Sequence, residues 1–144
     1  MGARVINKKD SWLMRLIGRF SPTFMRFFWT TYRLPFQKQA TIACPAGIED
    51  PLDDKHDKVI AHEMVHVKQL EPWYGPFLML FLYFLFPLPV FFSGRWFVER
   101  EAYLVDIKNG RVGLGSAVDI LWLAYFYCWP KSLMRKWFEK RVNV

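Results

Sequence analysis

The chain has 144 residues, enough for one domain with a hydrophobic core, and no linker-like segment divides it. It is 53% hydrophobic and 19% aromatic and carries a formal charge of +7, so its partners are expected to be anionic. RNA-binding signatures and zinc-finger spacings are absent from the sequence, and the aromatic residues gather in apolar runs. The composition therefore favours an anionic membrane surface over nucleic acid as a partner.

The start of the chain and its cysteines indicate a reducing compartment. Charged side chains interrupt any apolar stretch in the first 20 residues, so no secretory signal is expected. Cys44 and Cys128 are too few for a disulfide scaffold, and we expect two buried thiols, although a single bridge stays open. A cytoplasmic location fits these features, with peripheral attachment to a membrane as an option.

The first elements expected along the chain are a helix and two strands. Residues 11–20 form a short, basic amphipathic pattern with Ser11 as its cap. Residues 24–33 are rich in aromatic and β-favouring side chains and are interpreted as a strand, with a helix as the alternative. Residues 40–44 form a second strand, and residues 45–54 a loop rich in Pro, Gly and Asp.

A longer helix is expected over residues 55–70. Asp54 and Asp57 approximate a capping box at its start. Six residues at helical spacing then form one continuous face: Val59, His62, Glu63, His66, Val67 and Leu70. The polar members of this face therefore share it with the apolar residues that should turn toward a core.

The same helix contains the pattern H-E-x-x-H, formed by His62, Glu63 and His66. In a helix, two histidines four residues apart project from one face and can bind a single divalent metal. Glu63 lies beside them, where it can take a proton from a water molecule on that metal. An ordinary helix with two histidines is the alternative, but solvated histidines more often lie opposite the apolar stripe.

Residues 72–94 contain no charged side chain. About 20 such residues could cross a bilayer, but Pro87 and Pro89 argue against a straight span. We expect one apolar helix over about 75–86, followed by a Pro-rich bend. A bent hairpin that dips into one leaflet is compatible with a metal site formed by residues on either side of it.

Three helices are expected in the remainder of the chain. The first covers residues 94–108 and ends at Asn109-Gly110. Ser116-x-x-Asp119 predicts a capping box that opens an apolar helix over 117–129. Residues 131–142 form a basic amphipathic tail.

A tetrahedral zinc site needs a third protein ligand besides the two histidines. His56, six residues before His62, faces elsewhere on a continuous helix. In the helix over 94–108, periodicity selects Glu99, because Glu101 points nearly opposite to the face that Glu99 shares with Asp106. Glu101 stays the alternative ligand, and Asp106 could accept a hydrogen bond from a histidine.

His62-Glu63-x-x-His66 followed by Glu99-x-x-Ala102 resembles the gluzincin branch of the zinc metallopeptidases. The wider context, HEMVHVKQ and then FVEREAYLVDIKNG, is similar to small bacterial or phage proteins of H-E-x-x-H type. The resemblance implies that His62, His66 and Glu99 are ligands and Glu63 the general base. It also implies that the strand over 40–44 lines a substrate cleft. Tyr103 is a departure, because several gluzincins place an Asp there.

The sequence therefore predicts an α+β, mostly helical fold of one domain over 1–144. A zincin-like active-site helix and a Glu-bearing helix would accompany a short N-terminal sheet of two or three strands. The expected function is zinc-dependent hydrolysis of a peptide or protein substrate, with Glu63 as the base. The alternative is a basic, membrane-surface-associated protein without catalysis that keeps the metal site. A structural zinc is disfavoured, because such sites usually use thiolates and neither cysteine lies near the motif.

Overall fold

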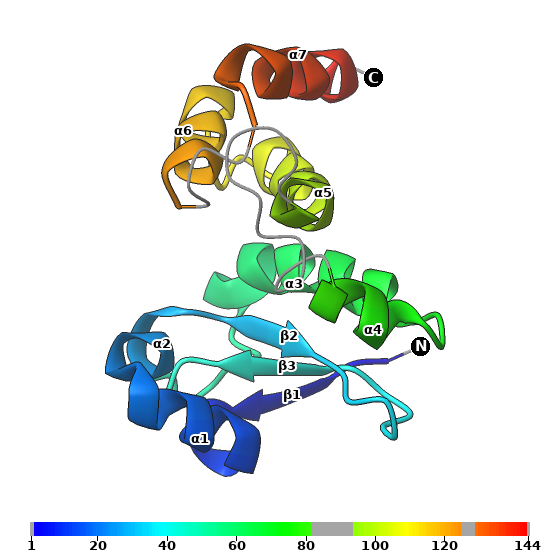
Figure 1. The fold of residues 1–144 in the computed structure, drawn as a ribbon. Helices are drawn as coiled ribbons and strands as arrows, with labels where there is room; N and C mark the ends of the chain where they lie inside the picture. Colours follow the sequence, from blue (N-terminus) through cyan, green and yellow to red (C-terminus); the bar gives the residue numbers. More distant parts are fainter. Residues whose placement is uncertain (1, 82–93, 125–128, 144) are drawn as a thin grey trace. The chain divides into compact units, whose positions relative to one another are not determined.

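The computed structural model describes residues 2–81, 94–124 and 129–143. The chain divides into two compact units, Met1–Pro76 and Phe77–Val144. The described residues are mostly helical and include one small sheet, which confirms the predicted α+β class (Figure 1).

The first unit combines a three-stranded sheet with helices. Its elements in chain order are β1 (Arg4–Asn7), the 3-10 turn η1 (Lys8–Asp10), α1 (Trp12–Phe20), α2 (Pro22–Phe27), β2 (Thr30–Tyr32), β3 (Thr41–Cys44), the 3-10 turn η2 (Asp54–His56) and α3 (Asp57–Leu70). The short helix α4 (Gly75–Leu80) begins at the end of this unit. The second unit contains α5 (Gly94–Lys108), α6 (Leu114–Ala124) and α7 (Lys131–Val142).

The last strand in the sequence, β3, is the middle strand of the sheet. The order is β1-β3-β2, with β1 parallel and β2 antiparallel to β3. All four β3 residues are buried, which agrees with a strand that is paired on both edges. Because neighbouring strands occupy both edges, β3 offers no free edge to which an extended peptide could add, and the predicted cleft at residues 40–44 stays a prediction. Sequence analysis also missed β1, a four-residue strand without a clear apolar pattern.

Successive residues of β2 connect the sheet to helices on its two faces. The Thr31 hydroxyl donates to the Glu63 carboxylate of α3, whereas the Tyr32 hydroxyl shares a hydrogen bond with Ser11, the cap of α1. Because successive side chains of a strand point to opposite faces, α3 and α1 lie on opposite sides of the sheet (Figure 1). The sheet is thus the layer that supports α3.

The helix α1 begins after Ser11 and ends at Phe20, close to its predicted bounds. The next segment differs from its prediction, because a strand was expected over 24–33. Pro22 lies in the first turn of α2, where its missing N–H costs nothing, and only Thr30–Tyr32 is extended. Gly18 of α1 lies directly against the Met25 side chain of α2, so the two helices approach closely.

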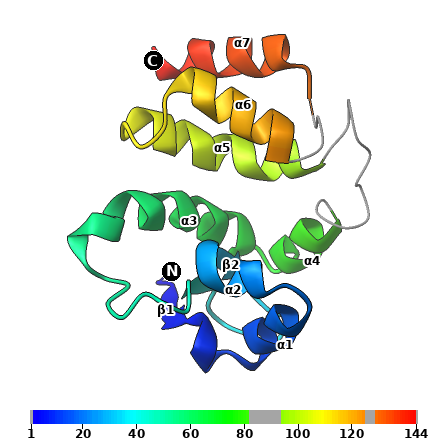
Figure 2. The same cartoon turned by 90° about the vertical axis from the view of Figure 1, so that its left-hand side faces the viewer.

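In the second unit, α5, α6 and α7 lie side by side around a small core (Figure 2). Its buried members are Trp96, Val118, Leu121, Met134 and Phe138. Helix α5 has its predicted bounds and is followed by Gly110 with a φ of 64°. The capping box at Ser116 is wrong, because α6 already begins at Leu114 and the N–H of Ala117 donates to the Gly113 carbonyl.

Part of the charge-free run over 72–94 is described. Helix α4 covers Gly75–Leu80, whereas residues 82–93, with the predicted Pro-rich bend, lie outside the described residues. The end of the helix expected over 117–129 falls partly on residues 125–128, which are also outside them. Among the helices that the structure describes, none has both the length and the apolar character needed to cross a bilayer.

Candidate metal centre

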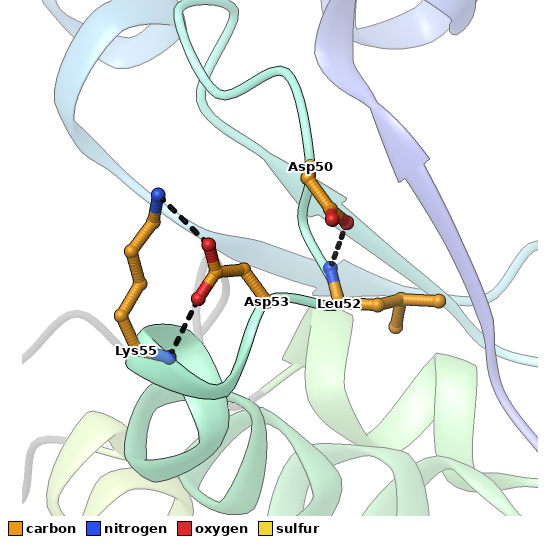
Figure 3. A network of polar contacts seen from close by, with 4 residues as sticks. All are labelled: Asp50, Leu52, Asp53 and Lys55. Carbon is orange, nitrogen blue, oxygen red and sulfur yellow. Dashed lines mark hydrogen bonds and ion pairs between the residues drawn. The ribbon is translucent and has the colours of Figure 1, made fainter.

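The 3-10 turn η2 in front of α3 is capped by an aspartate next to the one that the sequence indicated. The Asp53 carboxylate accepts from the Lys55 N–H at 3.0 Å and pairs with the Lys55 amine at 3.2 Å (Figure 3). Just upstream, the Asp50 carboxylate accepts from the Leu52 N–H. The predicted cap at Asp54 is wrong, because Asp53 caps the 3-10 turn η2 and α3 follows after His56 without a side-chain cap of its own.

The buried face of α3 carries the H-E-x-x-H residues, as predicted. His62, Glu63 and His66 are all buried, and they share the helix with the buried side chains of Val67 and Leu70. The ring centroids of the two histidines are 5.3 Å apart, with the planes inclined by 70°. Two adjacent, inclined imidazoles on one buried stripe are suited to a common ion.

A hydrogen bond within α3 determines which nitrogen of His66 could face a metal. His66 Nδ1 lies 2.9 Å from the Gln69 side-chain oxygen. In the neutral tautomer with its proton on Nδ1, His66 donates to this oxygen, and Nε2 is left with the lone pair that a metal requires. Metal-binding histidines usually have such a partner, which holds the ring in one orientation. Sequence analysis did not identify Gln69, although its spacing from His66 was visible.

The Glu63 carboxylate is held by the sheet. Thr31 Oγ1 donates to Glu63 Oε2 at 2.7 Å and also approaches the Glu63 carbonyl at 3.4 Å. The hydroxyl therefore anchors both the side chain and the backbone of the same helical residue. Thr31 was not predicted as a site residue, because 32 positions separate the two partners in the sequence.

A second contact joins the end of β2 to the end of α3. Arg33 Nη1 donates to the carbonyls of Leu70 and Glu71, at 2.6 and 2.8 Å. These carbonyls belong to the last turn of α3, where the helix leaves acceptors unsatisfied and where a positive charge is favourable. Thr31 and Arg33 thus attach α3 to the same strand at two points, one of them at Glu63.

Lys8 places a buried positive charge in the same unit. Its side chain is fully buried, and Nζ donates to the Phe24 carbonyl at 2.6 Å and lies 3.5 Å from the centroid of the Phe24 ring. Burial lowers the pKa of Lys8 to about 8, while the negative charge of Glu63 acts in the opposite direction.

In the second unit, Glu99 lies on a buried stripe of α5. Glu99, Ala102 and Asp106 are all buried and follow helical spacing. The Glu101 side chain, by contrast, is 46% exposed and pairs with Arg100 at 3.9 Å. Tyr103 is part of neither group and packs against the hydrophobic core of its unit. The periodicity argument that separated Glu99 from Glu101 thus agrees with their burial.

Asp106 accepts hydrogen bonds from the residues that follow the C-terminal end of α5. Its carboxylate accepts from Arg111 at 2.7 Å, and its carbonyl accepts from the N–H groups of Arg111 and Val112. The left-handed Gly110 reverses the chain so that these donors reach back to the helix. Asp106 therefore has a structural partner that the sequence did not indicate.

The remaining described histidine and cysteine have other surroundings. The His56 ring lies in η2 and packs against Trp29, with centroids 5.5 Å apart. Cys44 is a buried free thiol in β3, and burial raises the pKa of this thiol. A buried thiol with a raised pKa stays protonated and binds metal poorly. Cys128 lies outside the described residues.

Comparison of the chain with known protein families, with curated proteins and with solved structures gives no match.

Proposed function

We propose that this protein is a zinc-dependent peptidase in which His62, His66 and Glu99 bind the metal and Glu63 is the general base. The observation that carries the proposal is the H-E-x-x-H pattern on a buried helical face, with Glu63 anchored by Thr31 and His66 by Gln69. A helix that merely contained two histidines would not require a fixed carboxylate between them.

The donor set fits zinc. His62 and His66 are buried on α3 and Glu99 is buried on α5, and we propose these three side chains as the ligands. Two imidazole nitrogens and one carboxylate oxygen leave the fourth tetrahedral position for a water molecule or substrate, which is the pattern of catalytic rather than structural zinc. The lone pair on His66 Nε2 agrees with this assignment.

When bound, zinc would supply Lewis acidity that polarises a peptide carbonyl and makes a nearby water molecule more acidic. The proton of the attacking water passes to Glu63, and Glu63 then returns it to the nitrogen of the departing amine. Thr31 holds Oε2, so Oε1 is the oxygen that accepts and returns this proton.

Thr31 is a positioning residue in this scheme, and its hydroxyl can be removed with little change in shape. We expect Thr31→Val to lower the kcat for peptide hydrolysis about tenfold while metal content and KM stay the same, because Glu63 loses the bond that fixes its orientation. Thr31→Ser, which keeps the hydroxyl, should restore most of the rate. A lowered metal content in Thr31→Val would contradict a role confined to Glu63.

The proposal as a whole is tested by the metal content of the purified chain. We expect about one equivalent of zinc by elemental mass spectrometry, as a single site of three protein ligands requires. Removal of the metal with a chelator should lower the melting temperature and abolish cleavage of a mixed peptide library, and added zinc should restore both. Protein that refolds without zinc and keeps the same melting temperature when zinc is added would refute the site.

A further inference from the structure

The helix α1 exposes an apolar stripe. Trp12, Leu16 and Phe20 recur every fourth residue and are 61%, 45% and 86% exposed. Trp12 and Phe20 carry some of the largest apolar side chains of the chain, and exposing such side chains to water does not stabilise a helix. An exposed apolar row of this kind indicates an interaction surface.

Basic residues border the stripe, and α1 itself contains no acidic residue. Arg15 and Arg19 are exposed on the same helix, next to the apolar row. Residues 11–48 contain no Asp or Glu at all, but five basic side chains. An apolar row edged by arginines, on a helix without an acidic residue, is complementary to the headgroups and upper acyl chains of an anionic bilayer.

The opposite face of α1 is fully engaged in the fold. Met14 is buried, Gly18 lies directly against Met25 of α2, and Ser11 caps the helix and bonds to Tyr32 of the sheet. The exposed row therefore contributes little to folding, and the helix holds it in a fixed orientation. A preformed row loses little conformational freedom when it binds a surface.

The other basic helix, α7, lacks this property. It carries Arg135 and Lys136 on its exposed surface, but its apolar residues Met134 and Phe138 are fully buried in the core of the second unit. Leu133 is its exposed large apolar side chain (47%), whereas α1 presents the row of Trp12, Leu16 and Phe20. Because a stable peripheral contact needs both charge and apolar area, α1 is better suited to attach to a membrane than α7.

We propose that α1 docks the protein onto an anionic lipid bilayer, with its axis parallel to the surface. Trp12, Leu16 and Phe20 enter the region between headgroups and acyl chains, and Arg15 and Arg19 bind lipid phosphates. The attachment is peripheral and reversible by salt, because part of it is electrostatic. This inference does not depend on the proposed peptidase activity.

The test uses the full-length chain and sedimentation with sucrose-loaded vesicles. We expect binding to vesicles of phosphatidylcholine that contain about 30 mol % phosphatidylglycerol. Binding to vesicles of phosphatidylcholine alone should be at least tenfold weaker. Raising the salt from about 0.1 to 0.5 M should weaken the binding to anionic vesicles severalfold.

Matched variants locate the surface. Phe20→Ser should weaken vesicle binding about tenfold, whereas Phe36→Ser, which removes an equally exposed phenyl group (80% against 86%), should have little effect. Arg15→Gln with Arg19→Gln should weaken binding more than tenfold, at roughly fivefold for each arginine. Arg135→Gln with Lys136→Gln removes the same charge from α7 and should weaken it much less. Circular dichroism checks that each variant is folded.

Three outcomes overturn the proposal. The first is the absence of binding to anionic vesicles at low salt. The second is equal loss of binding in the α1 pair and the α7 pair, which would indicate net charge rather than a defined surface. The third is a wild-type dimer that Phe20→Ser dissociates, without vesicle binding, because the row would then cover a second copy of the chain.

Discussion

Replacing Glu63 by Gln is expected to lower the rate of peptide hydrolysis about a thousandfold without displacing the metal. The amide matches the carboxylate in shape and can still accept a hydrogen bond from Thr31 through its oxygen. It cannot accept and return a proton, which is the step assigned to Glu63, and positioned general bases contribute about 10² to 10⁴ in rate. The readout is the initial rate of cleavage of a peptide library, followed by mass spectrometry, at equal zinc content.

Glu71→Gln is the matched control for this experiment, since it makes the same chemical change at an exposed position at the end of the same helix. It should retain full activity. Equal rates in Glu63→Gln and the wild type would contradict the assignment of the base. A zinc-loaded wild type that cleaves no peptide, and that Glu63→Gln does not alter in any assay, would instead favour the non-catalytic, membrane-associated alternative.

Replacing Glu99 by Ala is expected to weaken zinc binding by about a hundredfold or more. A direct ligand is worth at least as much as the outer partners of ligands, whose loss typically costs 10- to 100-fold in metal affinity. The measurement is a competition titration against a chromogenic zinc chelator, together with the metal content of the protein as purified. Hydrolysis should be lost in parallel, because a two-histidine site holds zinc poorly at neutral pH.

Glu101→Ala provides the control, since this carboxylate lies two positions away on the same helix and its side chain is 46% exposed. It should leave the affinity for zinc within about twofold of the wild type, because exposed charge pairs contribute little. Stronger loss of zinc in Glu101→Ala than in Glu99→Ala would reverse the choice of ligand. Equal zinc affinity in all three proteins would exclude both acids and leave the histidines without a third partner.

The parts of the site that were predicted from sequence are those encoded by helical periodicity. His62, Glu63 and His66 follow the apolar spacing of one helix, so their position on its buried face was visible from the residues alone. The same argument separated Glu99 from Glu101, whose burial differs as expected. The ligand set itself stays a prediction, which the Glu99 and Glu101 variants test.

The parts that were not predicted depend on contacts between distant segments. Thr31, Arg33 and Lys8 each bond to a residue at least 16 positions away, and no local pattern marks such a pair. The pairing of short strands leaves no local pattern in the sequence either, and β1 was therefore not predicted. Before α3, the neighbouring residues Asp53 and Asp54 are equally suitable as helix caps by sequence. Only the 3-10 turn η2, which Asp53 caps, separates them.

The parallel pairing of β1 with β3 has a consequence for how the molecule is made. Arg4 of β1 aligns with Thr41 of β3, so β1 cannot pair until the ribosome has synthesised β3 in the middle of the first unit. During that interval α1 lacks the sheet against which it packs, and a helix of nine residues is only marginally stable alone in water. An anionic membrane near the ribosome would stabilise this amphipathic segment as a helix in the nascent chain before the sheet exists.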